Sequence, residues 1–413
     1  MNSGPVPPQA ASRSVIAPRR SVVLHADDFG MSAAVNHGIV AAFTQGILTS
    51  TSLLANAPAV DEALQGWNEL ELRRRHRVLP GDSLRRELRD PALPFDLGVH
   101  LNLTQGRPLT SGYPAELLDR DGRFPGIGRL FAGTLRKLPA GTADLVRREL
   151  ATQIESLLDA GAPLRHLNGH QYVECLPLVS SLVPGLAHQY GLESVRVACE
   201  ENLGRVLAEG RWTSWGLAQV KREFARRWRT QARTAQLTFA DSYVGTAHAG
   251  LWETSALAWC VEQAQGDRIE VGLHPGVAEE PGLRVIGDWS TPGPVLALET
   301  VSPGSRLATP ERRGAIPSQG PTRRTEVELP RGSSGSQFGS PEQSHGSPVV
   351  GETVRGVPAT DGWDDPLAKG RPRELAMLTS AEFASRLATG GCVLGRLAEW
   401  RQAAALPSWR KAG

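Results

Sequence analysis

The run Ser21-Val-Val-Leu-His-Ala-Asp-Asp-Phe-Gly30 decides the fold and holds the most informative residues of the chain. Its first six residues predict a buried strand, because apolar side chains dominate them. Two adjacent carboxylates, Asp27 and Asp28, follow at the carboxyl end of that strand. Open parallel sheets and barrels place their chemistry at the carboxyl ends of strands. The pair therefore marks a candidate functional site.

The acid pair has two interpretations. Neighbouring carboxylates repel each other, so the pair is easiest to explain if a cation or a shared proton lies there. The alternative is a strand-to-helix turn in which Asp28 only caps the following helix. The pair by itself does not decide between them.

The sequence after the pair alternates short apolar runs with helix-like segments. A helix is predicted over 32–45, where Ser32 can cap the start and Gly46 can end it, and a strand over 47–55. This βαβ pattern, repeated along the chain, predicts a parallel sheet, open or closed into a barrel. Further strands are predicted over 95–103, 164–173, 193–198 and 268–274, and further helices over 142–160, 177–190, 214–234, 251–265, 380–389 and 393–404.

Composition indicates how the chain is divided. Of the 413 residues, 40% are hydrophobic and 21% are charged, values typical of a globular protein. Residues 283–357 are rich in Pro, Gly and Ser and cannot bury enough apolar surface to offset their chain entropy. We predict a disordered lead over 1–20, one barrel-like catalytic domain over 21–282 and 358–406, and a low-complexity insertion over 283–357.

Charge, cysteines and hydropathy limit the partners and the compartment. The net charge of +2 creates no demand for nucleic acid. The four cysteines form no Cys-x-x-Cys pair, which fits a reducing compartment. No window approaches the ~20 apolar residues of a membrane span, and the first twenty residues lack a secretion signal. We predict a cytoplasmic protein without membrane or nucleic-acid partners.

Three histidines lie at the ends of other predicted strands: His100, His170 and His274. A single histidine in a strand is more often a hydrogen-bonded core residue than a ligand. However, four strand ends that each offer Asp or His would converge at one mouth of a parallel barrel. His166, four residues before His170, is then a candidate to support the ligands from behind or to act as an auxiliary ligand.

These residue types point to metal-assisted hydrolysis. Two imidazoles and a carboxylate leave open positions on a divalent ion, which lowers the pKa of bound water from ~15.7 towards ~7. One acid of the pair could bind the metal while its neighbour takes a proton from the water, and His274 could protonate the leaving group. The chain has no Gly-x-Ser-x-Gly elbow and no Gly-rich phosphate loop.

Several segments occur together and in a specific order. They are Ala26-Asp-Asp-Phe-Gly30, Gly46-Ile-Leu-Thr-Ser-Thr-Ser-Leu-Leu54, Gly98-Val-His-Leu-Asn-Leu-Thr-Gln-Gly-Arg-Pro108, His166-Leu-Asn-Gly-His170, Arg196, Asp241, His274-Pro-Gly276 and Arg373-Glu-Leu-Ala-Met-Leu-Thr379. With these segments the chain resembles the YdjC-like (ChbG-type) carbohydrate deacetylase family.

The resemblance implies an irregular TIM-barrel-like (β/α) fold, a divalent metal, usually Mg²⁺ or Zn²⁺, and a homodimer. It also implies hydrolysis of the acetamide of an N-acetylated sugar or oligosaccharide, such as chitobiose. Carried over by position, Asp27 would be the proton acceptor and His274 the general acid. Asp28, His100 and His170 would hold the metal. Alternating side chains of one strand end would then serve the ion and its water together.

One segment departs from the family pattern. Where the family usually reads Asp-Gly/Ser-His-x-His-x-His, this chain has Asn168-Gly-His-Gln-Tyr172-Val-Glu174. The departure leaves substrate choice and rate open. One fold can carry several substrates, so a metal hydrolase of another amide or ester, such as a glycolipid precursor, is an alternative. A degenerate, non-catalytic sugar-binding protein is another.

Overall fold

The computed structural model describes residues 20–76, 79–88, 95–134, 136, 138–200, 212–278 and 363–404. All of them belong to one compact unit, in which the chain before residue 279 packs with the chain after residue 362. The predicted insertion over 283–357 and the lead before Arg20 lie outside the described residues.

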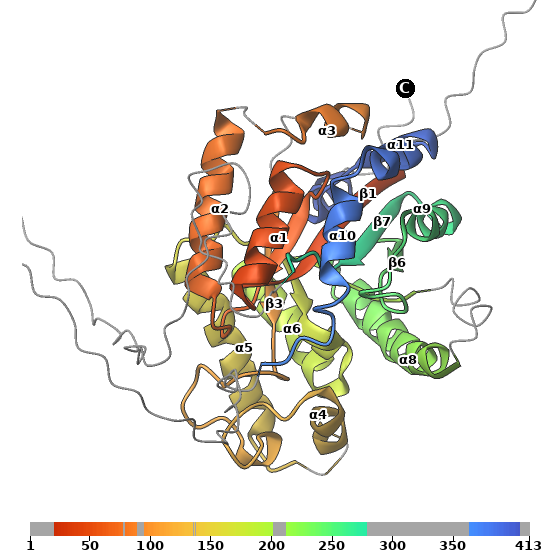
Figure 1. Ribbon diagram of the computed structural model, residues 1–413. Helices are drawn as coiled ribbons and strands as arrows, with labels where there is room; N and C mark the ends of the chain where they lie inside the picture. The colour runs from red at the N-terminus through yellow and green to blue at the C-terminus, as the bar shows by residue number, and fades with distance from the viewer. Residues whose placement is uncertain are drawn as a thin grey trace, which may run out of the picture. The chain divides into compact units, whose positions relative to one another are not determined.

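Strands and helices alternate along most of the described chain, as the sequence pattern predicts (Figure 1). The strands are β1 (Arg20–Phe29), β2 (Ser50–Leu53), β3 (Asp96–Leu101), β4 (His166–Gly169), β5 (Ser194–Val195), β6 (Ser242–Val244), β7 (Arg268–Leu273) and β8 (Cys392–Leu394). The helices are α1 (Ala33–Thr44), α2 (Val60–Arg75), α3 (Asp82–Leu88), α4 (Ile127–Thr134), α5 (Thr142–Asp159), α6 (Pro177–Tyr190), α8 (Trp212–Thr234), α9 (Thr254–Gln263), α10 (Arg371–Leu378), α11 (Ala381–Thr389) and α12 (Leu397–Ala404), with short 3₁₀ turns η1 (Ala115–Leu117) and η2 (His170–Cys175).

The described strands form one parallel sheet in the order β5-β4-β3-β2-β1-β7-β6, with β8 paired to β1. An isolated parallel bridge joins Ser194 of β5 to Thr238, just before β6, so the two ends of this order meet. The result is the TIM-barrel-like α/β fold that the sequence predicts. In such a fold the carboxyl ends of all the strands face one mouth.

Strand β1 is the centre of the sheet. One of its edges pairs with β7 from Ser21 to Ala26. Its other edge pairs first with β8, from Arg20 to Val22, and then with β2, from His25 onwards. The segment after residue 362 therefore completes the sheet beside the first strand of the domain.

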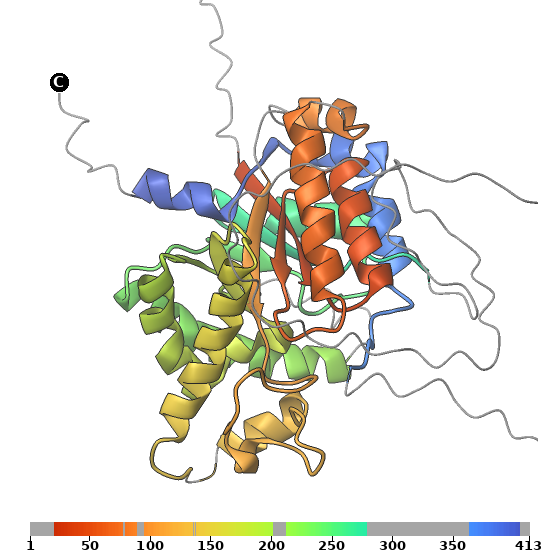
Figure 2. The ribbon, with the colours of Figure 1, turned by 90° about the vertical axis from the view of Figure 1, so that its left-hand side faces the viewer.

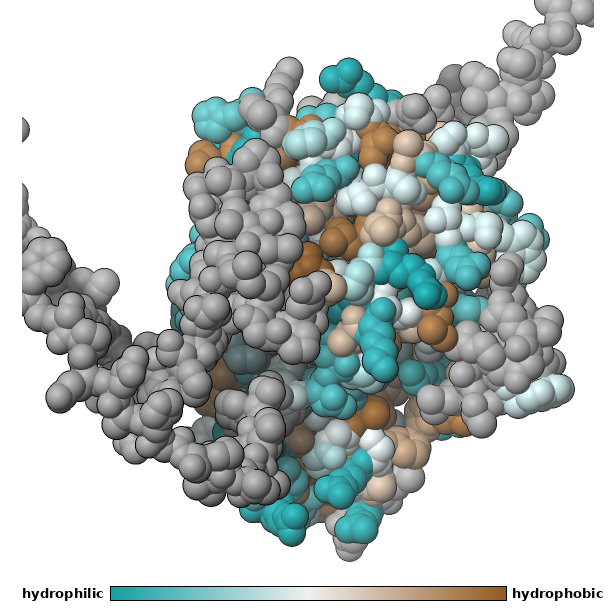
Figure 3. Space-filling model, viewed as in Figure 1, coloured by the Kyte–Doolittle hydropathy of each residue, from teal (hydrophilic) through white to brown (hydrophobic). Residues whose placement is uncertain are grey.

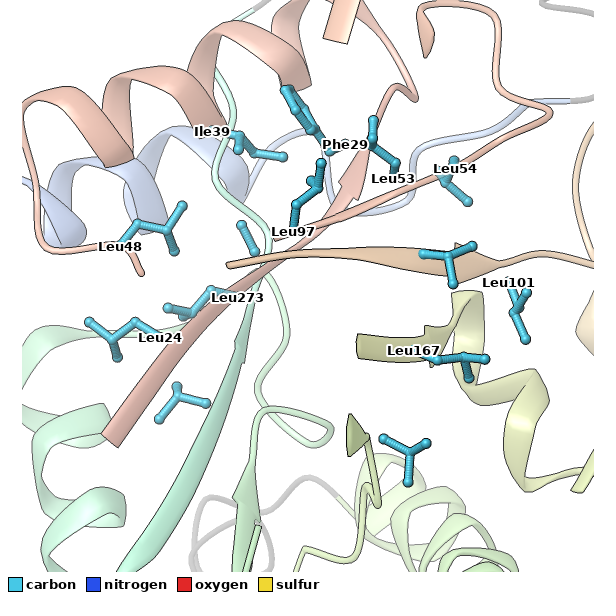
Figure 4. Close-up of a cluster of buried hydrophobic side chains, with 14 of the residues drawn as sticks. Leu24, Phe29, Ile39, Leu48, Leu53, Leu54, Leu97, Leu101, Leu167 and Leu273 are labelled. Carbon is cyan, nitrogen blue, oxygen red and sulfur yellow. The ribbon is translucent and has the colours of Figure 1, made fainter. Parts of the chain in front are cut away.

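The hydrophobic core lies between the sheet and the helices around it. Figure 4 shows leucines of β1, β3, β4 and β7 gathered with Ile39 of α1. Outside β1, α1 lies between α2 and α10 (Figure 1), and Figure 2 shows α1 and α2 side by side from a second direction. Alternate apolar side chains of β1, such as Leu24, point into this layer and are fully buried.

The interior of the sheet is polar, unlike the aliphatic interior of most such barrels. His25, Asp96, His166, Arg196 and Glu270 are fully buried there. At the amino ends of the strands, α12 closes the interior, where Trp400 packs against Val23 and donates to the Ser21 hydroxyl over 3.1 Å. The acid pair lies at the other end of this polar interior, at the carboxyl end of β1.

The strands predicted over 47–55 and 193–198 are shorter in the structure, at Ser50–Leu53 and Ser194–Val195, and two other predicted elements differ in part of their length. The strand predicted over 164–173 stops at Gly169, because Gln171 and Tyr172 adopt positive φ angles of 53° and 64° and form the turn η2. The helix predicted over 393–404 begins only at Leu397, since residues 392–394 pair with β1 as strand β8. The partner of β8 is β1, which lies far away in the sequence, so the local pattern does not reveal this strand.

Replacing Leu24 by Ala should lower the free energy of unfolding by about 2–5 kcal/mol, since a fully buried leucine leaves a cavity in the layer beneath α1. Urea denaturation followed by circular dichroism measures this. Leu72→Ala is the matched control, because Leu72 on α2 is 51% exposed. Equal losses for the two variants would contradict the assigned packing.

Candidate active site and metal centre

The acid pair lies within β1, at a bulge. The register pairs Ala26 with Thr51 but Phe29 with Leu53, so two residues of β1 oppose one residue of β2. Asp28 has φ = 71°, a left-handed conformation that Asp tolerates better than most residues. Neighbouring side chains of a regular strand point to opposite faces, but here both carboxylates line one cavity. The expected regular alternation is therefore wrong, and the bulge takes its place.

The helix-cap interpretation of Asp28 is also wrong. The N-cap of α1 is Ser32, whose hydroxyl accepts a hydrogen bond from the Val35 amide over 3.3 Å. Asp28 lies four residues earlier and turns away from this helix start. Both oxygens of its carboxylate are engaged by residues of other elements.

Asp28, His100 and His170 form a buried cluster. One donor atom from each lies within 4.8 Å of the other two. The Asp28 Oδ1 atom is 2.9 Å from His170 Nδ1 and 3.5 Å from His100 Nε2. These residues come from β1, from the end of β3 and from the start of η2, which the parallel sheet brings to one mouth.

The cluster fits a divalent cation. A carboxylate and two imidazoles are the donors of many catalytic zinc sites. His170 faces Asp28 through Nδ1, and its buried Nε2 atom has no hydrogen-bond partner among the described residues, so no competing hydrogen bond holds this ring away from a metal. Burial would raise the pKa of Asp28, but His170 and Arg371 outweigh it and hold that pKa well below its usual range. Asp28 is therefore an anion.

Asn168 connects the cluster to Asp27. Its Oδ1 atom accepts a hydrogen bond from His100 Nδ1 over 2.8 Å, which leaves His100 Nε2 to face Asp28. Its Nδ2 atom donates to Asp27 Oδ1 over 3.0 Å. An amide can do both, whereas a carboxylate at this position would have no proton for Asp27. This gives a physical reason for the departure at residue 168.

Asp27 is held from three sides. Arg196 Nη1 lies 2.6 Å from Asp27 Oδ2, and Arg196 Nε lies 2.6 Å from Glu270. Burial would raise the pKa of Asp27, but the Arg196 charge and nearby imidazoles hold it well below its usual range. His25 Nε2 is 3.3 Å from Asp27 Oδ1, and burial lowers the pKa of His25 to about 3, so it stays neutral.

His274 follows β7 and faces Asp27. The distance from His274 Nε2 to Asp27 Oδ2 is 3.8 Å. Its backbone amide donates to Glu374 Oε2 over 2.5 Å, and Glu374 Oε1 accepts from the Gly250 amide over 2.7 Å. Glu374 of α10 thus fixes the strand end that carries His274.

Arg371 is a site residue that sequence reasoning missed. Its Nη2 atom lies 2.7 Å from Asp28 Oδ2, and its Nε atom lies 2.6 Å from Asp365. Arg371 is nearly fully buried. Arg371 lies far from the acid pair in the sequence. No spacing or motif near Asp28 indicates that this arginine belongs to the site. Only the packing of α10 against α1 and β1 brings it there.

The other departures from the family pattern lie near the cluster, where Tyr172 is half-buried and Glu174 is fully buried. The Tyr172 hydroxyl lies 3.3 Å from the Tyr243 hydroxyl, and the Tyr172 ring lies under the Lys221 ammonium, 4.9 Å from its centroid. Neither oxygen of Glu174 has a hydrogen-bond partner among the described residues. Burial raises the pKa of Glu174 to about 8.

His166 is not a member of the cluster. Its Nδ1 atom lies 3.4 Å from Asp96 Oδ1, and its ring makes an edge contact with His25 at 4.9 Å between centroids. It lies in the polar interior opposite Gly98, two residues before the level of His100 along the neighbouring strand. The structure therefore gives no support to His166 as an auxiliary ligand.

A cavity of about 420 Å³ opens onto these groups, within the ~300–1,000 Å³ range of small-molecule sites. Its lining includes all five sequence-predicted site residues, which the fold thus brings together: Asp27, Asp28, His100, His170 and His274. Asp364, Asp365 and Arg371 complete one wall from the segment after residue 362.

The fold and the site together define a class: α/β-barrel proteins with a carboxylate–histidine cluster at the carboxyl ends of the strands. The family model described as YdjC-like protein matches residues 21–306. The chain therefore belongs to the YdjC-like protein family.

Relatives agree with this membership, and a solved structure shares the fold. The carbohydrate deacetylase of Listeria monocytogenes is 33% identical over 189 residues, which are 45% of this chain and 64% of the relative, so the match spans less than two thirds of it. The human carbohydrate deacetylase is 31% identical over 284 residues, 64% of this chain and 77% of the relative. A crystal structure from Enterococcus faecalis V583, provisionally named a cellobiose-phosphate cleavage protein, shares the fold, with a TM-score of 0.54 and 16% identity over 94% of this chain and 100% of that one.

Asn168→Ala should weaken metal affinity about 10- to 100-fold, because His100 loses the acceptor that orients its ring. Competition for Zn²⁺ with a chromophoric chelator measures the affinity. Asn56→Ala is the control, since Asn56 bonds to loop carbonyls and not to the cluster. Unchanged affinity in Asn168→Ala would contradict this positioning role.

Glu174 should make stability depend on pH. Its folded pKa of about 8 exceeds the ordinary value of 4.5, so the folded protein holds a proton that the unfolded chain has released. The free energy of unfolding therefore falls as pH rises from about 4.5 towards 8.

Glu174→Gln should remove this loss and gain on the order of 2–4 kcal/mol relative to the parent protein between pH 5 and pH 8. Urea denaturation at the two pH values measures the gain. Glu382→Gln, at an exposed acid of α11, is the control. A gain that is the same at both pH values would refute the assignment.

Proposed function

We propose that the protein is a divalent-metal-dependent hydrolase that removes the acetyl group from N-acetylated amino sugars, including chitooligosaccharides. One observation carries the proposal: the bulge in β1 directs two adjacent carboxylates into one cavity, where Asp28 joins the histidine cluster and Asp27 stays outside it. The activity in the names of the relatives supports the same reaction.

Asp28, His100 and His170 would hold the metal ion. Such an ion lowers the pKa of a water ligand and polarises the acetamide carbonyl. Two imidazoles among three protein donors suit Zn²⁺ better than Mg²⁺, which prefers oxygen ligands. We therefore place Zn²⁺ before Mg²⁺, the ion that the family resemblance names first.

Asp27 accepts a proton from the attacking water. Arg196 and Asn168 each bind one of its oxygens and fix the orientation of the carboxylate. Because Asp27 is an anion beside Arg196, it is ready to take a proton without first losing one.

His274 delivers a proton to the leaving amine of the sugar. His274 lines the cavity, its Nε2 atom lies 3.8 Å from Asp27 Oδ2, and Glu374 holds its backbone. Water attack and amine protonation together give acetate and the free amino sugar. The hydrolysis requires a general base for the attacking water and a general acid for the leaving amine.

Location and assembly complete the proposal. The described helices include none with the length and apolar character needed to cross a bilayer. All four cysteines are buried thiols. We propose a cytoplasmic location on the basis of these thiols, and the homodimer implied by the resemblance stays a prediction.

Acetate release from chitobiose should require metal and should fall by about 100- to 10,000-fold in Asp27→Asn, since the proton acceptor is lost. The assay compares protein before and after chelation, with Zn²⁺ or Mg²⁺ restored. Metal binding should persist in Asp27→Asn but not in Asp28→Asn.

Asp61→Asn, an exposed acid on α2, is the matched control and should keep full activity. Activity that survives chelation would rule out the metal mechanism. Tight sugar binding by metal-loaded protein without turnover would instead support a binding protein.

A further inference from the structure

The catalytic cavity has two chemically different sides. The acid pair, the histidine cluster and Arg371 form one side. The other side is apolar and is here called the apolar wall. It consists of Ile127 and Phe131 of α4, Leu176 before α6, and Val220 and Phe224 of α8.

Two helices from distant parts of the chain meet to build this wall. The rings of Phe131 and Phe224 make an edge contact, with centroids 5.3 Å apart and planes at 82°. Figures 1 and 2 both show α4 beside α8 at the lower end of the domain. Ile127, Phe131 and Phe224 pack with one side on the main core and keep the other side on the cavity.

Part of the apolar wall is exposed to solvent. Val220 is 53% exposed, although it lines the cavity. Hydrophobic residues also reach the surface in the region of α4 and α8 in Figure 3. An apolar surface that adjoins a reaction centre is a common mark of a ligand site.

An unsubstituted sugar suits this wall only in part. The C–H face of its ring can stack on Phe131 or Phe224, but its hydroxyl groups would lose hydrogen bonds to water and find no donor or acceptor on these five side chains. The lining also holds polar groups, among them Gln105, Gln171 and Thr246, and Lys221 lies beside Val220 on α8 with its ammonium over the Tyr172 ring. A substrate that fills the whole cavity therefore needs a polar end and an apolar end.

We propose that the apolar wall binds a hydrocarbon substituent carried by the N-acetylated sugar, so that the preferred substrate is an alkyl-type glycoside. This inference rests on the proposed deacetylation. The wall is continuous with the catalytic groups, so a sugar with its acetamide at the histidine cluster can extend its substituent along α4 and α8. A second sugar ring on the wall is the competing occupant.

The test compares acetate release from the methyl and hexyl β-glycosides of N-acetylglucosamine and from chitobiose, all below micelle-forming concentrations. The hexyl compound should have a kcat/KM at least about tenfold above that of the methyl compound, because several CH₂ groups leave water on the wall. Equal values for the two glycosides would overturn the proposal, as would a preference for chitobiose over the hexyl compound.

Variants of the apolar wall test whether the hydrocarbon binds there. Val220→Ser and Ile127→Ser should each reduce the hexyl-to-methyl ratio of kcat/KM several-fold, whereas Leu72→Ser, at an exposed leucine outside the cavity, should keep the ratio. A ratio unchanged in both wall variants would place the hydrocarbon elsewhere and overturn the proposal.

Binding without chemistry separates this inference from the proposed function. Hexyl β-glucoside has no acetamide, and calorimetry should show that it binds more tightly than methyl β-glucoside and that Val220→Ser weakens this binding. If no substrate releases acetate, the proposed function fails, and the calorimetric comparison still decides whether the wall binds hydrocarbon.

Discussion

The structure depends on the burial of two adjacent carboxylates at the end of β1. Removing one such anion from water is costly unless it is paired, and two neighbours also repel each other. Arg196 supplies a positive charge to Asp27, and Arg371 supplies one to Asp28. Each arginine is itself buried and divided between two acids, Glu270 in one case and Asp365 in the other. The candidate metal site lies within this balance of charges.

The charge balance explains why the segment after residue 362 belongs to the same domain. It adds β8 to the edge of β1 and closes the interior with α12. From α10 it provides Arg371 to Asp28 and Glu374 to the backbone of His274. Without these groups Asp28 would keep its imidazole neighbours but lose its buried cation. The cavity would also lose one wall.

Polar side chains inside the sheet hold the site residues in place through hydrogen bonds. His25, Ser50 and Ser52 form a hydrogen-bonded column that ends at His100 and Asp27. Such a network fixes ring orientations, which an aliphatic interior could not do because it offers no hydrogen bonds. Asn168 joins it and contacts both the candidate ligand and the candidate base. The apolar residues of the barrel are displaced to its outer layer, where Leu24 and Leu273 pack beneath the helices.

The sequence by itself determined the parallel α/β class, the site at the strand ends and the five residues that meet there. It could do so because strand period, helix caps and strand-end residues are local signals. It placed Asp27 and Asp28 side by side, but only the bulge at Asp28 decided that both carboxylates enter one cavity. Tertiary structure alone also brought in Arg371, removed His166 from the cluster and set the apolar wall against the catalytic groups. These features depend on contacts between residues far apart in the chain, and a local sequence pattern carries no record of such contacts.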